Sequence, residues 1–381
     1  TILRDFQGES VKLDLSDATH RNFMKRLVDF YTPSRNRYSH MDLTTAKIST
    51  AYTLTGIDLI NCLLDLDHEE NSRMLRDLFA DISGNISAIT SGRSVHDCLF
   101  SPQHMNSTQC QSYFLFVGRL TSTDLGTQLL SSLDVFRKLE HLATTTNNDC
   151  YVKLIVSSLD YGNVGPCREL LGAVLRCPVE SSRLYATQFL LVLLRAGIGG
   201  FCDWGVKFLV NQLRDKARSV YLTALNILHE ACELQSCLET LVKLNPNMGS
   251  FGEKGSLLAI RLLSVASGFQ VLNKNDFVLN EIKRWDDYFS CRYIKLVEGE
   301  TSDVLTLHQR DEDGKYDKRT SAIRMISRKD FFLPPHLYGQ LARHTDGFLM
   351  LVHHGYLETM LQVTGASCDE DNNLTLGIFR P

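Results

Sequence analysis

SRLYATQFLLVLLRAGIGGFCDWGVKFLVNQL, residues 182–213, is the stretch that decides the fold of this chain. Its first half, Leu184–Leu194, is apolar nearly all round, which is typical of a helix buried between neighbouring layers. In its second half Val206 and Leu209 belong to a single apolar face, as in a helix of an outer layer. Between the two halves, Gly199 and Gly200 suit the end of a helix. The stretch therefore predicts two helices joined by a short corner.

Similar helix pairs recur on both sides of this stretch. Leucines near the end of each first helix align at positions 120, 159, 194, 228 and 263, with separations of 39, 35, 34 and 35 residues. A period of this length, with two apolar helices per unit, is the signature of an α-solenoid. We therefore predict an all-α, armadillo/HEAT-like α-solenoid, with Leu191 and Leu225 buried between layers. The alternative is an irregular helical bundle whose helix lengths happen to repeat.

The sequence on either side of the repeats predicts four parts. Residues 1–111 contain helices and then a loop at 84–111, because that segment is rich in Ser, Thr, Asn and Gly. Residues 112–290 hold the helical repeats. Residues 291–345 include a short alternating run and the dipeptide Asp313-Gly314, which predict a short hairpin or extended insertion near 300–330. Residues 346–381 form a partial terminal helical repeat.

Composition excludes several classes of protein. Hydrophobic residues make up 44% and charged residues 22% of the chain, as in ordinary globular proteins. The net charge of −4 does not provide the basic surface of a nucleic-acid-binding protein. The most apolar stretch, Leu184–Leu194, is too short to span a membrane, and no signal peptide is visible. Eleven cysteines without a CxxC pair indicate reduced thiols, as in a cytosolic or nuclear protein, and we predict a cytoplasmic location. Segment length and net charge predict that the protein neither inserts into membranes nor binds nucleic acid.

A search for catalytic and metal-binding motifs is negative. The string GEKGS at 252–256 lacks the spacing of a phosphate-binding loop, and no GxSxG motif occurs. His229-Glu230 begins like a zinc-binding helix, but position 233 is Glu instead of His. His353 and His354 are adjacent, so on a helix they point about 100° apart and do not chelate one ion. We therefore predict no catalytic residues, no metal site and no cofactor.

Two basic clusters are candidate binding sites. Arg21, Lys25 and Arg26 share one sector of a predicted helix, which suits a nucleotide, an inositol phosphate or an acidic partner. The alternative is a solvated helix face. The second cluster lies in the predicted insertion and is either a soluble loop or a patch for docking a partner protein. It comprises Lys318, Arg319, Arg324 and Arg328.

Six strings, in order along nearly the whole chain, closely resemble the Rictor family, the rapamycin-insensitive companions of TOR. They are LVDFYTPS (27–34), KLIVSSLDY (153–161), RLYATQFLLVLLRA (183–196), WGVKFLVNQLRDKARSVYLTALNILHEACE (204–233), GEKGSLLAIRLLS (252–264) and LPPHLYGQL (333–341). The resemblance implies a central part of such a protein. It includes the middle helical region, the segment likened to a Ras-exchange-factor N-terminal domain, and the block that follows. From about Thr364 the sequence departs from the family.

The resemblance also implies a function. Members of the family are non-catalytic scaffold subunits of the second TOR kinase complex, in which their partners are the TOR kinase, the SIN1 subunit and a small WD-repeat subunit. That complex phosphorylates AGC kinases such as Akt and affects the actin cytoskeleton.

The alternative is a regulatory module that binds a nucleotide or inositol phosphate on the basic helix. An armadillo-type transport adaptor is disfavoured, because the chain has only Trp204 and Trp285 and lacks the Trp and Asn ladder of such adaptors.

Overall fold

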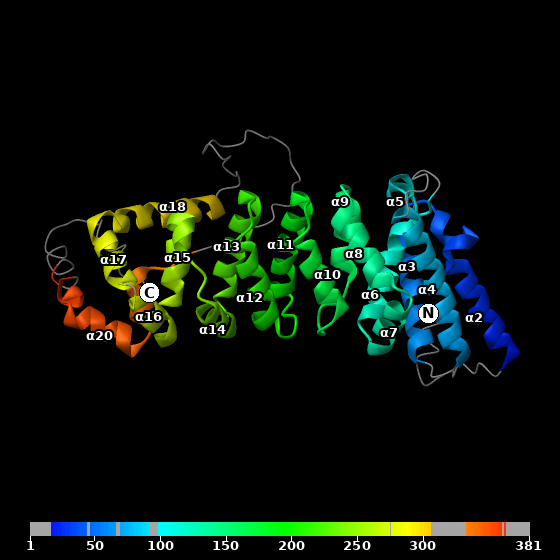
Figure 1. Cartoon of the computed structure of the whole chain (residues 1–381), viewed down its shortest axis with the longest axis horizontal. Coiled ribbons are helices and arrows are strands. Elements are labelled where there is room, and N and C mark those ends of the chain that lie inside the picture. Colours follow the sequence, from blue (N-terminus) through cyan, green and yellow to red (C-terminus); the bar gives the residue numbers. More distant parts are fainter. Residues whose placement is uncertain are drawn as a thin grey trace. The chain divides into compact units, whose positions relative to one another are not determined.

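The computed structural model describes residues 17–43, 46–65, 69–90, 98–274, 276–305, 333–359 and 362. Most of these residues are helical and none forms a β-strand, although one antiparallel bridge pairs Asp42 with Thr108. The all-α prediction is therefore confirmed (Figure 1). The chain divides into two compact units: unit 1 comprises residues 1–201 and 211–224, and unit 2 comprises residues 202–210 and 225–381. The predicted divisions at 111/112 and 290/291 do not coincide with this one.

Unit 1 is a stack of helices in which neighbours in sequence pack against each other (Figure 1). Helix α6 packs on α3, α7 and α9, while α8 packs on α4, α9 and α10, and α9 also packs on α11. The elements are α2 (Ala18–Tyr31), η1 (Pro33–Arg35), η2 (Tyr38–His40), α3 (Ala46–Asp65), α4 (Glu69–Thr90), α5 (Pro102–Ser107), η4 (Gln109–Ser112), α6 (Tyr113–Thr121), α7 (Asp124–Ser132), α8 (Val135–Thr145), α9 (Asp149–Ser158), α10 (Pro166–Val174) and α11 (Glu180–Arg195). Helices α12 (Phe201–Gln212) and α13 (Arg218–Ala231) contribute residues to both units.

An aromatic cluster fixes the first helices of unit 1. Tyr31, Tyr38, Tyr113 and Phe116 are fully buried. The ring centroids of Tyr31 and Tyr38 lie 4.9 Å apart, and those of Tyr113 and Phe116 lie 5.6 Å apart in an edge-to-face arrangement. The Tyr113 hydroxyl donates a hydrogen bond of 2.7 Å to the Tyr31 carbonyl oxygen at the end of α2. Edge-to-face contacts add stability beyond the burial of area, so this cluster sets the position of α2.

Unit 2 has a core built around a long helical segment. Helices α17 and α18 are joined without a break by the π-helical turn η6, on which Trp285 and Phe289 are fully buried. Cys202 and Cys237 form a disulfide, so the prediction that all cysteines are thiols is wrong for this pair. The elements are α14 (Gln235–Leu244), η5 (Gly249–Phe251), α15 (Gly252–Leu262), α16 (Ala266–Asn273), α17 (Phe277–Arg284), η6 (Trp285–Phe289), α18 (Ser290–Leu305), α19 (Leu337–Leu341) and α20 (Thr345–His353).

Three of the corners between paired helices have a glycine at the same position. At Gly126, Gly268 and Gly347, an added Cβ would lie 2.0 to 2.4 Å from the carbonyl oxygen of the leucine six residues earlier. Each glycine is the third residue after the N-cap of the second helix, so a larger side chain would push the two helices apart. At the corner between α13 and α14 the third residue after the N-cap is Cys237.

The loop predicted at 84–111 is wrong for residues 84–90 and for most of residues 102–111. Helix α4 continues to Thr90, and α5 and η4 follow at Pro102–Ser107 and Gln109–Ser112. The Asn85 side-chain amide and the Ser87 hydroxyl donate to carbonyl oxygens four residues earlier, at 2.9 and 3.0 Å. These polar side chains are satisfied by their own helix, and Ile86 anchors the turn in the core. Residues 91–97 lie outside the described residues.

Two further expectations need correction. Helix α18 continues to Leu305, so the hairpin or extended insertion expected near 300–330 is wrong for its first residues, and 306–332 lie outside the described residues. Leu225 is fully buried as predicted, but Leu191 is only half-buried, and its neighbour Val192 is 54% exposed. Helix α11 packs against α9 and α10 and leaves one side open, so it is not buried all round.

Candidate functional site

Helix α2 carries the first predicted basic cluster. The Asp17 carboxylate caps the helix by accepting a hydrogen bond of 2.7 Å from the Thr19 amide. Met24, Val28 and Tyr31 form the buried face. Because side chains three and four positions apart lie on the same face of a helix, this packing turns the other side of α2 to solvent. Lys25 and Arg26 are exposed there, and Arg21 is half-buried.

A carboxylate from α4 lies against this cluster. The Lys25 ammonium is 2.6 Å from one oxygen of Glu70, and the Arg21 guanidinium is 3.8 Å from the other. Glu70 belongs to the first turn of α4, where an acidic side chain is also favoured by the helix dipole. The sequence alone does not associate Glu70 with the cluster, because its proximity results from the packing of α2 on α4.

A second carboxylate partly neutralises the basic residues after α2. The Asp29 oxygens lie 2.7 Å from Arg35 and 3.4 Å from Arg37. Within the described residues Arg26 has no ion pair. Exposed pairs of this kind contribute about 0–1 kcal/mol each and are screened by salt. Lys25 and Arg26 remain exposed on the sector, where they can attract a polyanion in competition with Glu70.

The second predicted cluster, Lys318, Arg319, Arg324 and Arg328, lies outside the described residues. It stays a prediction from the sequence.

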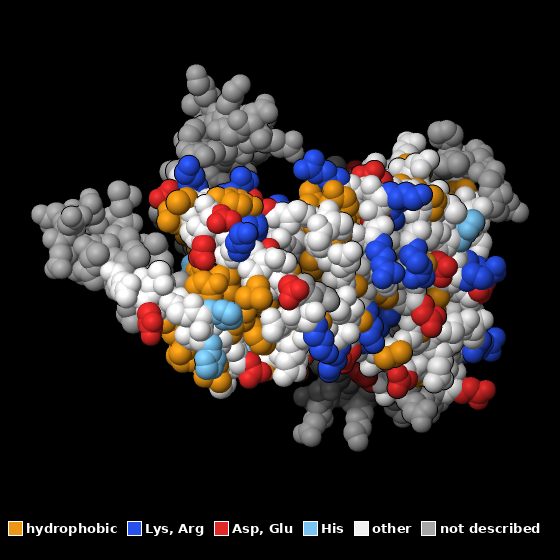
Figure 2. All heavy atoms as spheres, turned by 60° about the vertical axis from the view of Figure 1, so that its left-hand side comes forward, with side chains coloured by type: hydrophobic (Ala, Val, Ile, Leu, Met, Phe, Trp, Pro, Cys, Tyr) orange, Lys and Arg blue, Asp and Glu red, His pale blue; other side chains and the backbone are white. Residues whose placement is uncertain are grey.

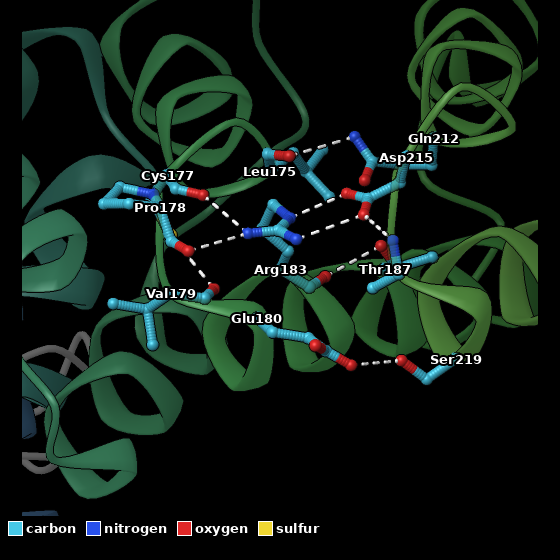
Figure 3. Close-up of polar contacts among 11 residues, drawn as sticks. Leu175, Cys177, Pro178, Val179, Glu180, Arg183, Thr187, Gln212, Asp215 and Ser219 are labelled. Atoms are coloured by element: carbon cyan, nitrogen blue, oxygen red, sulfur yellow. Dashed lines mark hydrogen bonds and ion pairs between the residues drawn. The ribbon is translucent and has the colours of Figure 1, made fainter.

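A different arrangement of charges joins the segments around α11 in unit 1 (Figure 3). The Arg183 guanidinium binds Asp215 through two hydrogen bonds, Nε to Oδ2 at 2.6 Å and Nη2 to Oδ1 at 3.1 Å. Its remaining nitrogen, Nη1, donates to the carbonyl oxygens of Cys177 and Pro178 at 2.9 and 3.0 Å. One side chain therefore ties the connector before α11 to the connector after α12.

Neighbouring polar groups strengthen this tie. The Gln212 amide donates to the Leu175 carbonyl oxygen at 3.1 Å, and the Ser219 hydroxyl donates to Glu180 at 2.7 Å (Figure 3). The side chains of Arg183 and Asp215 are only 14% and 8% exposed. The Arg183–Asp215 network is thus a largely buried set of charge-assisted hydrogen bonds, which are roughly twice as strong as neutral ones.

Electrostatics in the network favour the charged forms of both partners. Burial by itself raises the pKa of Asp215, but the hydrogen bonds from Arg183 and from the Ala217 amide outweigh it and hold the pKa below its ordinary value. The hydrogen bond to Asp215 raises the pKa of Arg183. The network is consequently a fixed ion pair at neutral pH.

In the sequence, Arg183 is recognisable only as the charged boundary of an apolar run. The one available signal was its position at the start of a first helix, with Asp215 following 32 residues later, close to one repeat length. Many surface residues share such a spacing, so the pairing becomes evident only in the folded chain.

Apolar side chains remain exposed on α20 of unit 2. Phe348, Leu349 and Val352 are each nearly half exposed, whereas Leu351 on the same helix is buried. Figure 2, which brings the left-hand side of Figure 1 forward, shows hydrophobic side chains beside histidines on the surface. Grouped exposed apolar residues of this kind are typical of surfaces that bind other proteins.

Within the part of the chain that the structure describes, no cluster of three or more His, Cys, Asp or Glu side chains has the arrangement of a metal site. None of the helices there combines the length and the apolar character that crossing a membrane requires.

Two family models match consecutive parts of the chain. The first, described as the middle domain of the rapamycin-insensitive companion of mTOR, matches residues 91–194. The second, described as the RasGEF_N domain of the same protein, matches residues 200–307. Together they cover helices from α5 to α18.

Individual relatives match nearly the whole chain. The human protein named rapamycin-insensitive companion of mTOR is 37% identical over 349 residues, which are 92% of this chain and 20% of the human protein. Protein pianissimo A of Dictyostelium discoideum is 30% identical over 92% of this chain. The Schizosaccharomyces pombe protein named target of rapamycin complex 2 subunit ste20 is 26% identical over 95% of it. The chain spans about a fifth of the length of the mammalian relatives it matches.

Proposed function

The chain belongs to the Rictor family, and on that premise we propose that it is a scaffold segment of the second TOR kinase complex. The proposed partners are the TOR kinase, the SIN1 subunit and the small WD-repeat subunit. The segment would act without catalysis, in the cytoplasm, by supporting assembly of the complex and phosphorylation of AGC kinases such as Akt. Relatives that are themselves named as subunits of target of rapamycin complex 2 support this proposal.

The observation that carries the proposal is the 37% identity to the human protein named rapamycin-insensitive companion of mTOR, along 92% of the chain. The helical stack supports it, because stacked helical repeats offer extended surfaces for partners. The exposed apolar side chains of α20 are a candidate contact, since binding hot spots are apolar anchors that become desolvated in the complex.

Retention of purified partners by the chain tests this proposal. We expect the immobilised chain to retain at least one of the TOR kinase, SIN1 and the WD-repeat subunit. Replacing Phe348 and Leu349 on α20 by serine is expected to weaken retention at least tenfold if α20 is a contact. Leu125→Ser, at an exposed apolar residue of unit 1, is the matched control. A folded chain that retains none of the three subunits would contradict the proposal.

A second proposed function is binding of a nucleotide or inositol phosphate by Arg21, Lys25 and Arg26. The observation that favours it is that three basic side chains share one sector of α2, where Lys25 and Arg26 are exposed and Glu70 is the paired carboxylate of Lys25 and Arg21. A polyphosphate would replace Glu70 as the partner of Lys25 and Arg21, and such exposed contacts weaken as salt rises.

The competition with Glu70 makes this second function testable. ATP or inositol hexakisphosphate is expected to raise the melting temperature by ligand linkage. Glu70→Gln should increase the apparent affinity severalfold, and charge reversal at Lys25 and Arg26 should abolish the shift. Asp134→Asn, which removes an exposed carboxylate elsewhere in unit 1, is the control and should leave the affinity unchanged. Equal affinities for the Glu70 variant and the unaltered chain would count against a site at this sector.

A further inference from the structure

Two cysteines of unit 2 are placed for direct reaction with each other. Cys202 lies on the first turn of α12 and Cys237 on the first turn of α14, with their Cα atoms 4.4 Å apart and their sulfurs bonded. This Cα separation is within the range of natural disulfides. Disulfides in reducing compartments are usually transient and redox-sensing. We propose that Cys202 and Cys237 form a reversible thiol–disulfide modification site, which glutathione disulfide oxidises and thiols reduce.

The surroundings of the two sulfurs differ in a way that suits this chemistry. Cys202 is partly exposed, and the Ser236 hydroxyl donates a hydrogen bond of 3.1 Å to its sulfur. A donor at this position stabilises the thiolate, which is the reacting form. Cys237 is 1% exposed. An accessible attacking thiol beside a shielded second thiol is the arrangement that converts a mixed disulfide rapidly into an internal one.

The other described cysteines lack this combination. Six of them are buried: Cys62, Cys98, Cys110, Cys167, Cys177 and Cys232. Cys150 is partly exposed, and burial raises the pKa of its thiol. Burial raises the pKa of Cys110 and of Cys167 to about 11 and that of Cys232 to about 12, so these thiols stay protonated. Cys291 is exposed, so the oxidant can reach it, but it forms no disulfide with another described cysteine.

The reaction proceeds in two balanced exchanges. The Cys202 thiolate attacks one sulfur of glutathione disulfide, and the glutathione S–S bond breaks as the Cys202–glutathione bond forms. One glutathione thiolate leaves and takes up the proton that Cys202 lost. The Cys237 thiolate then attacks the Cys202 sulfur and releases the second glutathione. Overall, two protein thiols lose two electrons and two protons, and one glutathione disulfide becomes two glutathione thiols.

Oxidation has a structural consequence within unit 2. The bond connects α12 to α14 across 35 residues of sequence. A crosslink of this length restricts the unfolded chain and thereby stabilises the folded one. Reduction therefore removes this restriction and lowers the stability of the folded chain. This inference does not rest on the proposed scaffold function.

Thiol counting in glutathione buffers tests the site. The native chain is equilibrated at increasing ratios of oxidised to reduced glutathione, its remaining thiols are alkylated, and its mass is measured. We expect oxidation to remove two alkylated thiols, a crosslinked peptide containing Cys202 and Cys237, and a higher melting temperature. Cys237→Ser should instead retain glutathione on Cys202. Cys291→Ser, the control, should form the crosslink as the unaltered chain does.

Two results would overturn the proposal. One is absence of the Cys202–Cys237 peptide at every buffer ratio, in a chain whose circular dichroism remains helical. The other is a Cys237→Ser chain that gains no more glutathione on Cys202 than on the buried Cys232. Ser236→Ala gives a further readout, because loss of the hydroxyl donor should slow the first exchange several-fold and leave the crosslink itself intact.

Discussion

Helix α2 and helix α11 each carry an arginine near their start, Arg21 and Arg183, that lies beside a carboxylate, yet the two regions use their charges differently. On α2, Arg21 and Lys25 share Glu70 at a surface where the lysine side chain is 52% exposed. On α11, Arg183 is 14% exposed and all its nitrogens bond to Asp215 or to backbone carbonyl oxygens. Water and salt screen the first set of charges but largely not the second.

The difference shows that burial, more than residue type, assigns the role of a charge. An exposed pair contributes little to stability, so its partners remain available to a ligand. A buried pair is costly to break, because either charge alone would be left without water or a partner. The Arg183–Asp215 network therefore serves the architecture, and the α2 sector is the region of the two that suits recognition.

Removing Arg183 is expected to have the largest effect. Arg183→Met leaves Asp215 buried without its partner and should lower the free energy of unfolding by about 3–5 kcal/mol. Denaturant unfolding measures the change. The control is Arg137→Met, which breaks an exposed pair with Asp134 in the same unit and should change little. Equal losses in the two variants would break the distinction drawn between buried and exposed pairs.

Two uncharged residues of α11 test the same contrast between a buried and a partly exposed side chain. Leu190 is fully buried and its neighbour Leu191 is half-buried. Leu190→Ala should cost about 2–5 kcal/mol, as expected for a truncated core leucine. Leu191→Ala should cost clearly less, because less apolar surface leaves contact with protein. Thermal unfolding of the two variants gives the comparison, and a larger loss for Leu191 would contradict the position assigned to this helix.

Lowering the pH should remove the contribution of Asp215 to the free energy of unfolding. Its pKa is lowered in the folded chain, so the folded state binds the proton less readily than the unfolded state. The stabilisation is therefore complete above the ordinary pKa of 3.8 and is lost as pH falls through the lowered value. We expect the stability difference between the unaltered chain and Asp215→Asn to shrink over that range. Urea unfolding at several pH values measures it, and a difference that grows with acid would refute the assignment.

The smallest effect is expected at Glu70. Glu70→Gln removes a carboxylate that contacts Lys25 and Arg21 at the surface, and should change the free energy of unfolding by less than about 1 kcal/mol. High salt should abolish even this change. Melting temperatures at low and high salt provide the measurement. A large, salt-independent loss would place Glu70 with the buried pairs.

Much of the fold could be predicted because helices depend on the local pattern of apolar residues, which can be read from the sequence. The leucines spaced 34–39 residues apart lie near the ends of first helices, and the fully buried Leu225 follows from the same pattern. The segment 84–90 was misjudged for a local reason too. Ser, Thr and Asn suggest loops, but here Asn85 and Ser87 bond to their own helix and Ile86 supplies the burial.

The candidate sites were only half predictable. Arg21, Lys25 and Arg26 could be placed on one sector, since a helix fixes the positions of residues four and five apart. Glu70 could not be added, because it comes from another helix. Asp215 and the Cys202–Cys237 pair escaped for the same reason, with partners 32 and 35 residues apart.

By itself the sequence determined that this chain is helical, where most of its paired helices fall and which family it resembles, because these depend on the order of neighbouring residues. Only the tertiary structure decided which charges are buried together, which remain at the surface and which two cysteines meet. Those outcomes depend on how helices pack, and a shift of one residue turns a helix by about 100° and so changes every partner.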